Sequence, residues 1–428
     1  MNRRNFITST LAASAFINHR TVAASDKVNL AIIGVRSRGK TLATGFAALS
    51  DVNVAYVCDV DERVLGAAAQ AVEQKAGKRP QLIGDLRRVL DDKSVDAVVI
   101  ATPDHWHALA TIWGCQAGKD VYVEKPCSHN LREGRLMIEA ARRNKRIVQH
   151  GTQSRSRPST QRAIAYIQSG KIGKVLMAKA WDVQLRDDIG RKQDSPVPKG
   201  VDYDTWTGAA PLLPFNENRF HYNWHWHWNY GTGDAGNDGV HQIDMARWAL
   251  GVEAPNEVSG MGRKIFFQDD QQTPDTMNIT FNCGDKALIF EMRIWNPYQM
   301  EGVGNGVAVY GSEGMVQIGR WDGKWGFKAF DSKGKEVHFD NANEPDHHAR
   351  NFIDCIRSRQ APNAEIAVGH TSTTFAHLAN IVARTGRNLK FDAKTETILG
   401  DAEANRYLRR QYRKHWATPK DTSMTARS

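Results

Sequence analysis

The sequence predicts an α/β protein that joins an N-terminal doubly wound parallel sheet to a C-terminal α/β domain with an open, mostly antiparallel sheet. The chain has 428 residues, too many for one compact core, so two domains are expected. Over residues 26–150, continuous apolar strands alternate with helical patterns, as in a parallel sheet covered on both faces. Over residues 151–428, the strands alternate apolar with polar residues, as in a sheet with one covered face.

The predicted elements follow in order along the chain, from the period of the apolar residues. In the first domain, strands are expected at 28–33, 52–58, 95–101, 121–123 and 146–148, and helices at 40–49, 62–75, 105–118 and 131–144. In the second, strands are expected at 175–183, 277–282 and 287–294, and helices at 346–359, 367–387 and 402–412.

The composition excludes several classes of protein. No run of 18 apolar residues occurs, so no stable membrane insertion is expected. The formal charge is +10, but no basic patch carries a known reading motif, so no nucleic-acid partner is expected. The basic stretch 407–414 is interpreted as a solvated helix. The five cysteines form neither a disulfide framework nor a metal pattern, which predicts free, mostly buried thiols.

A glycine turn stands where the first strand passes into a helix. Residues 34–39 read Gly-Val-Arg-Ser-Arg-Gly, against the dinucleotide fingerprint G-x-G-x-x-G. Gly34 supplies the tight turn, and Gly39 the close contact between helix and strand. Arg36 replaces the middle glycine, so its side chain either points away from the pyrophosphate or serves the phosphates itself.

An acid at the end of the second strand supports this assignment. Asp59 lies 20 residues after Gly39, where a carboxylate meets the ribose hydroxyls of the adenosine. Its charge repels a 2′-phosphate and favours NAD, whereas Arg36 and Arg38 leave NADP open. Strand, turn, helix, strand and acid fall in order, which predicts a Rossmann domain over residues 26–150.

Residues 1–24 predict an export signal. Arg3 and Arg4 precede a mildly apolar run from Leu11 to Ile17, and small residues follow before Ser25. This arrangement resembles a twin-arginine signal, with a basic amphipathic helix as the alternative. It implies passage through the twin-arginine export machinery of a bacterium to the periplasm or beyond. Free dinucleotide is expected to be scarce there, so a tightly bound cofactor is expected.

Lys125, in the segment Val123-Glu124-Lys125-Pro126, directly follows a buried strand. Ligands of such sheets gather at the carboxyl ends of the strands. Partial burial and the positive charge of an oxidised nicotinamide would both favour the neutral amine. Lys125 is therefore a candidate acid/base, or a donor to a substrate oxygen. A surface lysine in a turn is the alternative.

A second polar segment opens an apolar helix at residues 236–250. If it is helical, Asn237, His241 and Asp244 share one face that can line a pocket, and Asp238 points about 100° away. A capped or core histidine is the alternative for His241.

The run 221–228 alternates tryptophan with histidine. At strand spacing, residues of one type share a face. Tryptophan faces stack on the apolar faces of sugars, so Trp224, Trp226 and His225 are candidate carbohydrate-binding residues. Aromatic packing between domains is an equal alternative. A histidine metal site lacks a supporting pattern, so no metal is expected.

The order of these motifs resembles the Gfo/Idh/MocA oxidoreductase family over nearly the whole chain after residue 24. The residues that carry the resemblance are Ile33-Gly34, Gly39, Asp59, Ala101-Thr102-Pro103, His107, Glu124-Lys125-Pro126 and Gly239-Val240-His241-Gln242-Ile243-Asp244. An exported subgroup is also similar in its segment Asn218-Arg219-Phe220-His221, its tryptophan–histidine run and its Gly-Asp-Ala-Gly-Asn stretch.

The resemblance implies hydride transfer at a carbinol carbon of a sugar, cyclitol or related polyol. It implies that Lys125 orients the substrate oxygen, that His241 transfers the proton or partners the group that does, and that the second domain forms a homo-oligomer, a dimer or tetramer. The expected cofactor-binding residues are Gly34, Arg36, Ser37, Arg38, Gly39, Asp59, Thr102, Pro103, His107 and Glu124. The expected substrate-binding residues are Trp224, His225, Trp226, Asn237 and Asp244.

One departure from the family pattern is Asn237, where an aspartate usually stands four residues before the histidine. An amide cannot take a proton. Asp238 or Asp234 could compensate, although helical geometry disfavours Asp238, and tuning by Lys125 and His241 alone is the simpler interpretation. Three functions therefore stay open: an oxidoreductase with a resident cofactor, a glycoside-cleaving enzyme that oxidises its substrate transiently and then eliminates the glycosidic oxygen, and a non-catalytic sugar sensor.

Overall fold

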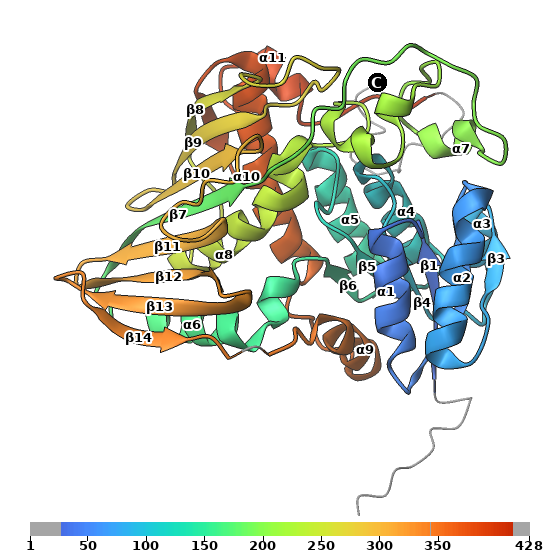
Figure 1. Cartoon of the computed structure of the whole chain (residues 1–428), viewed down its shortest axis with the longest axis horizontal. Helices are drawn as coiled ribbons and strands as arrows, with labels where there is room; N and C mark the ends of the chain where they lie inside the picture. Colours follow the sequence, from blue (N-terminus) through green and yellow to red (C-terminus); the bar gives the residue numbers. More distant parts are fainter. Residues whose placement is uncertain (1–26, 343, 414–428) are drawn as a thin grey trace, which may run out of the picture.

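The structure, a computed structural model, describes residues 27–342 and 344–413. The predicted signal at residues 1–24 lies outside the described residues. Figure 1 shows two sheets side by side, and the predicted fold class is confirmed: a parallel sheet comes first and a mostly antiparallel one follows. None of the described helices is long and apolar enough to cross a membrane.

The first sheet has six parallel strands in the order β3-β2-β1-β4-β5-β6. Its strands are β1 (Val28–Ile33), β2 (Val52–Cys58), β3 (Gln81–Ile83), β4 (Ala97–Ile100), β5 (Asp120–Val123) and β6 (Val148–His150). Its helices are α1 (Arg38–Ala47), α2 (Glu62–Ala76), α3 (Leu86–Asp91), α4 (Asp104–Gln116) and α5 (Leu131–Arg143). The edge strand β3 and the short α3 were not predicted, because β3 has three residues and none is buried.

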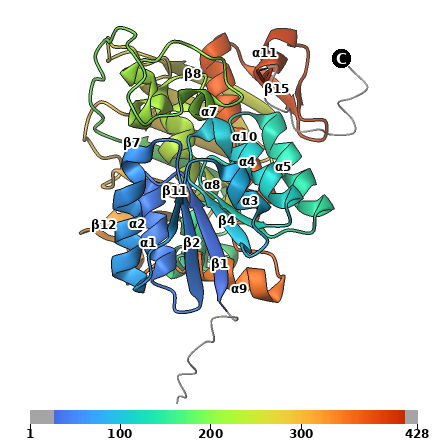
Figure 2. The same cartoon turned by 90° about the vertical axis from the view of Figure 1, so that its right-hand side faces the viewer.

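Helices cover both faces of this sheet (Figure 2). Helices α3, α4 and α5 pack on one face, and α1 and α2 pack on the other. The second face is completed by α9 (His348–Ser358), from the C-terminal half of the chain. The fully buried ring of Phe352 meets Phe46 at 6.1 Å and Tyr122 at 6.0 Å between centroids, both edge-on. The hydrophobic core of the first domain therefore includes residues beyond the predicted boundary at 150.

The second sheet has ten strands in the order β14-β13-β12-β11-β7-β10-β9-β8-β15-β16. All its pairs are antiparallel except β7 with β10. The strands are β7 (Val175–Val183), β8 (Glu257–Arg263), β9 (Thr276–Asn282), β10 (Ala287–Arg293), β11 (Asn305–Gly311), β12 (Gly314–Trp321), β13 (Lys324–Asp331), β14 (Glu336–Asp340), β15 (Leu389–Asp392) and β16 (Thr397–Ile398). Helices α6 (Pro158–Gln168), α8 (Val240–Leu250) and α10 (Ile366–Thr385) cover one face.

A long segment follows β7 and leads to the π-helical turn η5 (Ala235–Gly239) before α8. It has little regular structure beyond α7 (Tyr203–Thr207) and the 3₁₀ helices η3 (Glu217–Arg219) and η4 (His221–Trp226). It arches over the first domain in Figure 1 (green). We call residues 200–230 the cap. The cap joins the first domain through an antiparallel bridge between Val201 and Asp61. The strand spacing expected for the tryptophan–histidine run is wrong, because η4 coils it.

The C-terminal stretch also differs from expectation. The helix predicted at 402–412 ends early, as α11 (Ala402–Arg406). The following residues are not a solvated helix: Arg410 donates to Glu133 at 2.7 Å, and the buried Tyr412 hydroxyl donates to the same carboxylate oxygen at 2.8 Å. The chain thus packs back onto α5. The cysteine prediction is confirmed, since all five are free and only Cys283 is not buried.

Candidate active site

A cavity of about 360 Å³ lies between the carboxyl ends of the first sheet, the cap and the start of α8. Its walls include ten predicted residues of the first domain: Gly34, Arg36, Ser37, Arg38, Asp59, Thr102, Pro103, His107, Glu124 and Lys125. From the second domain, Trp224, His225, Asn237 and His241 also line it. Residues predicted from separate motifs therefore meet in one space.

The glycine turn is as tight as the fingerprint requires. Gly34 has φ +79°, and a Cβ there would lie 2.7 Å from the Ala101 backbone. A Cβ on Gly39 would lie 1.7 Å from the Gly34 carbonyl oxygen. Helix α1 begins just after Ser37, with no acid in its first turn and no side-chain cap. Such a helix start suits a diphosphate, and Arg36 is exposed beside it.

Asp59 is held at the end of β2 by two backbone amides. Its carboxylate oxygens accept from the N–H of Val35 at 2.8 Å and of Asp61 at 3.0 Å. Burial raises the pKa of Asp59 to about 6, although both amides oppose the shift. The turn, the free helix start and this carboxylate fit a nicotinamide dinucleotide, with Asp59 toward the adenosine ribose.

An ion pair closes the base of the glycine turn. Arg38 Nε donates to Glu124 Oε1 at 2.7 Å. Burial opposes the charge on Glu124, but Arg38 and then Lys125 outweigh it and lower its pKa to about 2. Glu124 is therefore an anion that anchors Arg38 rather than an acid for catalysis.

Two residues that follow β4, Thr102 and His107, form another part of the cavity wall. The ring nitrogens of His107 lie 2.6 Å from the carbonyl oxygen of Pro126 and 2.8 Å from that of Thr102. His107 thus ties the loops after β4 and β5 together and is a positioning residue. The buried Thr102 hydroxyl has no hydrogen-bond partner among the described residues, so it is available to a ligand.

Lys125 meets the second domain at Asn237. Its Nζ donates to Asn237 Oδ1 at 2.8 Å, and Asn237 Nδ2 donates to Asp234 Oδ1 at 2.8 Å. The amide therefore links the ammonium group to a buried carboxylate. Ala235–Gly239 form one turn of π-helix before α8, which sets the direction of Asn237.

His241 lies beside this pair at the start of α8. Its Nδ1 is buried and has no partner among the described residues. Burial, and then the charge of Lys125, lower its pKa to about 3. The imidazole is therefore neutral at physiological pH, a weak base that can take part in hydrogen bonds to a substrate.

Two predicted substrate-binding residues lie away from the cavity. Asp244 is fully buried and accepts from Arg155 Nε at 2.8 and 3.0 Å and from the Ser372 hydroxyl at 2.5 Å, because an acid at that depth needs a cation. Trp226 is 2% exposed and packs in the core of the second domain. Trp224 and His225 do line the cavity, stacked with their ring centroids 3.6 Å apart.

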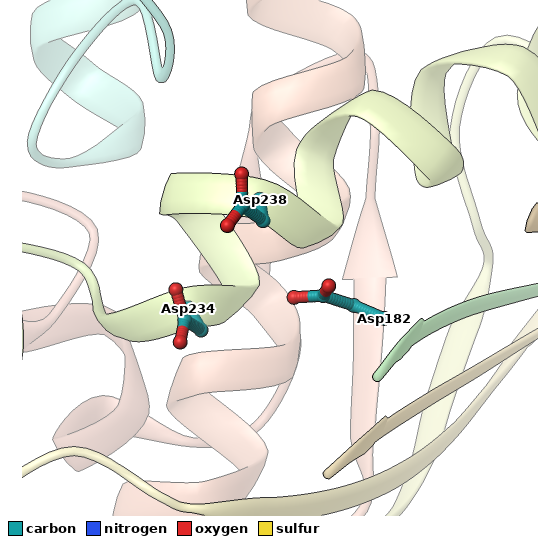
Figure 3. A group of neighbouring side chains, drawn as sticks. All are labelled: Asp182, Asp234 and Asp238. Atoms are coloured by element: carbon teal, nitrogen blue, oxygen red, sulfur yellow. The ribbon is translucent and has the colours of Figure 1, made fainter. Parts of the chain in front are cut away.

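The structure also corrects the predicted direction of Asp238 and adds residues that the sequence did not indicate. Asp238 lines the cavity, because the π-turn rotates it from the direction expected for an α-helix. Behind it stand Asp234 and Asp182, the latter near the end of β7 (Figure 3). From the cap, Trp206, His221 and Tyr222 complete the walls, and no motif in the sequence had placed them there.

Several known proteins are similar to this chain in sequence. Inositol 2-dehydrogenase 2 of Saccharopolyspora erythraea is 32% identical over 232 residues, 53% of this chain and 55% of that protein. A glycosyl hydrolase family 109 protein of Stenotrophomonas maltophilia is 35% identical over 142 residues, 31% of each chain. The chain thus spans about half of the first relative and about a third of the second.

A solved structure shares the fold. The WlbA dehydrogenase of Bordetella pertussis, crystallised with NADH and UDP-GlcNAcA, superposes with a TM-score of 0.65 at 18% identity, covering 86% of this chain and 99% of that one.

Two sequence models of protein families match the chain. The model described as "Oxidoreductase family, NAD-binding Rossmann fold" matches residues 28–152. The model described as "Oxidoreductase family, C-terminal alpha/beta domain" matches residues 180–418. Together with the turn, the acid and the lysine in one cavity, these matches lead to one conclusion: the chain belongs to the Gfo/Idh/MocA oxidoreductase family.

Proposed function

We propose that this protein oxidises or reduces a carbinol carbon of a sugar, glycoside or cyclitol with a resident nicotinamide dinucleotide. The observation that carries the proposal is the convergence of Lys125, Asn237 and His241 in the cavity that Asp59 and the glycine turn also line. When bound, the dinucleotide exchanges a hydride with the carbinol carbon.

Side chains of the protein orient the substrate and form hydrogen bonds with its hydroxyl groups. Lys125 Nζ has further N–H groups beside the one given to Asn237, so it can donate to the carbinol oxygen. His225 gives its Nδ1 hydrogen to the carbonyl of Tyr222, which leaves Nε2 as an acceptor for a substrate hydroxyl. Trp224 stacks behind His225 and offers an aromatic wall for the sugar ring.

NAD is the dinucleotide we propose. The Asp59 carboxylate supports this choice, because its charge would repel a 2′-phosphate and no basic side chain of the described residues forms an ion pair with it. We also propose that the cofactor stays bound through catalysis. The cap supports this, because Trp206 and His221 roof the same cavity and Asp202 N–H donates to the Val60 carbonyl at 2.9 Å, next to Asp59.

Export and assembly complete the proposal. Arg3 and Arg4 support transport by the twin-arginine machinery to the periplasm, a route for folded proteins that suits a resident cofactor. The face of the second sheet opposite its helices supports a homo-oligomer, since it carries a second apolar cluster around Trp181 with Tyr310, Met315 and Trp321 only partly covered.

A second candidate function is glycoside cleavage by transient oxidation. Oxidising a ring hydroxyl makes the neighbouring C–H acidic, so that the glycosidic oxygen leaves by elimination. The likeness to a glycosyl hydrolase family 109 protein over 142 residues favours this candidate.

The test is the identity and redox state of the dinucleotide that copurifies with the full-length protein. Mass spectrometry of the supernatant after denaturation should find NAD or NADH near one per chain. Incubation of the holoprotein with inositols, hexoses and aryl glycosides, monitored by reduced-nicotinamide absorbance, separates the candidates. A lasting change favours oxidoreduction, and aglycone release without net change favours cleavage. Absence of any dinucleotide would overturn the proposal, and bound dinucleotide without turnover of any probe would favour a sensor.

A further inference from the structure

Three carboxylates from two separate elements meet at the cavity, where Asp238 lines the wall and the other two lie behind it. Asp182 comes from β7, and Asp234 and Asp238 come from the turn before α8 (Figure 3). One oxygen of each lies within 4.8 Å of one oxygen of the other two. Gln184 bridges two of them, donating to Asp182 at 3.0 Å and to Asp238 at 3.2 Å.

One cation already occupies this cluster. Arg186 donates to both oxygens of Asp234 at 3.0 Å and also pairs with Asp238. Its third contact is the Tyr222 hydroxyl, at 2.9 Å. Three carboxylates are also a ligand set for a hard divalent cation, but here a guanidinium fills the position between two of them.

The charges in the cluster do not balance without a proton. Arg186 neutralises one of three carboxylates, and Lys125 compensates Asp234 only through the Asn237 amide. Asp182 is fully buried, and its Oδ2 has no partner among the described residues. An ionised oxygen in that state would be very costly, whereas a carboxylic acid is tolerated.

The pKa values of Asp182, Asp234 and Asp238 shift in different directions for the same reasons. Burial, and then the charges of Asp238 and Asp234, raise the pKa of Asp182 well above its ordinary value. Burial and Asp234 also raise the pKa of Asp238. Arg186 overcomes the effect of burial on Asp234 and lowers its pKa. A proton is therefore held on Asp182, next to an Asp238 that faces the cavity.

We propose that Asp238 is the proton acceptor of the reaction and that Asp182 behind it is a permanently protonated positioning residue. This inference rests on the proposed oxidoreduction. In the oxidative direction, the carbinol C–H bond breaks and its hydride passes to the oxidised dinucleotide. The O–H bond breaks, its proton passes to the Asp238 carboxylate, and the C–O bond becomes a carbonyl. Asp238 thus supplies the proton-accepting group that Asn237 cannot.

Two isosteric substitutions test the assignment, because asparagine resembles a protonated aspartate and not an ionised one. In the holoprotein, D238N should slow reduction of the bound dinucleotide by an inositol, hexose or aryl glycoside about 100-fold or more. D182N should lose much less, about tenfold at most, because asparagine keeps the neutral state of a protonated aspartate. D188N, at an exposed position in the same segment, is the matched control. Equal losses in D182N and D238N would overturn the proposal.

The pH profile distinguishes proton transfer from support of the fold. Asp238 is faced by Asp182 of β7, by Gln184 and Arg186 after it, by Asp234 in the same turn, by Lys125 after β5 and by Tyr222 of the cap. The wild type and D182N should both lose rate as the pH falls and Asp238 takes up a proton. D238N should lack this acid limb. An acid limb that survives unchanged in D238N would overturn the role of Asp238.

A substrate-free measurement keeps this inference separate from the proposed function. The infrared difference spectrum of wild type minus D182N, at neutral pH, should contain the carbonyl stretch of a protonated carboxyl group. Its absence would overturn the protonated Asp182 even if turnover is found, and its presence would stand even if no probe is oxidised. A divalent metal retained at one per chain after purification would also overturn the assignment.

Discussion

Lys125 reaches its position through a chain of three partners rather than through direct contact with an acid. The ammonium group donates to the Asn237 amide, which donates to Asp234, which pairs with Arg186. An amide between two ions has only one useful orientation, with its oxygen toward the cation and its nitrogen toward the anion. Asn237 therefore fixes where the lysine points without being able to exchange a proton.

Removal of the lysine should abolish turnover and leave the cofactor in place. We expect K125A to lose about 100-fold or more in the rate of reduction of the bound dinucleotide, because the substrate oxygen loses its donor. Dinucleotide content, measured on the denatured protein, should match the wild type. K333A, an exposed lysine on the far sheet, serves as the control. Turnover by K125A close to that of the control would remove Lys125 from the mechanism.

Restoring the acid usual in the family at residue 237 should not improve the enzyme. In N237D, a carboxylate oxygen replaces a nitrogen that lies 2.8 Å from Asp234. Two carboxylates at that distance share a proton, so the pKa of the new acid should rise. We expect near-wild-type rates at neutral pH and a loss of rate at alkaline pH, where the shared proton leaves. A pH–rate profile of the holoprotein, with N237A as the uncharged comparison, checks this. An alkaline limb identical to that of the wild type would contradict it.

At the scale of elements, regular periodicity was predictable and local irregularity was not. The apolar runs at 28–33 and 52–58 became β1 and β2 as expected, because burial on both faces leaves only apolar residues there. The π-turn at Ala235–Gly239 had no signal in the sequence, and it decides that Asp238 rather than Asp244 borders the cavity. A one-residue change in helical register is set by tertiary packing, here by Gly239 lying against Phe290, so sequence patterns do not report it.

Helix α9 should contribute to the stability of the first domain through Phe352. Phe352 is fully buried between Phe46 and Tyr122, so F352A should lower the free energy of unfolding by about 3–5 kcal/mol. Unfolding of the first domain in urea, monitored by the release of the dinucleotide, measures this loss. Residue 352 lies far beyond residue 150, where the first domain was predicted to end. F266A, at a ring that is 55% exposed, should cost about 1 kcal/mol or less. Equal effects of the two substitutions would show that α9 is not part of the first domain's core.

For the whole molecule, buried histidines predict how stability depends on pH. His105, His150 and His377 are at most 6% exposed, and burial lowers the pKa of each to about 3. In the unfolded chain they titrate near 6.5, so below that pH the unfolded state binds more protons. Stability should be full above pH 6.5 and should fall as the pH drops toward 3, by about 1.4 kcal/mol per histidine and pH unit. Calorimetric melting at pH 7.5, 6.5 and 5.5 checks this, and a constant Tm would contradict it.

The boundary between the two domains was the feature that the sequence predicted least well. The change of texture near residue 151 marks the end of the first sheet, since β6 ends at His150. It does not mark the end of the first core, because contacts between distant segments leave no periodic trace. Ile366 of α10 and Tyr412 near the end of the described chain both pack in the core beneath α4 and α5.

These late contacts have a consequence for biosynthesis. Phe352 closes one face of the nucleotide domain, and Ile366 and Tyr412 close the other. A ribosome delivers the glycine turn and Asp59 first and these closing residues last. The nascent nucleotide domain therefore exposes apolar surface during most of the synthesis of the chain. The dinucleotide meets a finished site only after residue 412 has left the exit tunnel.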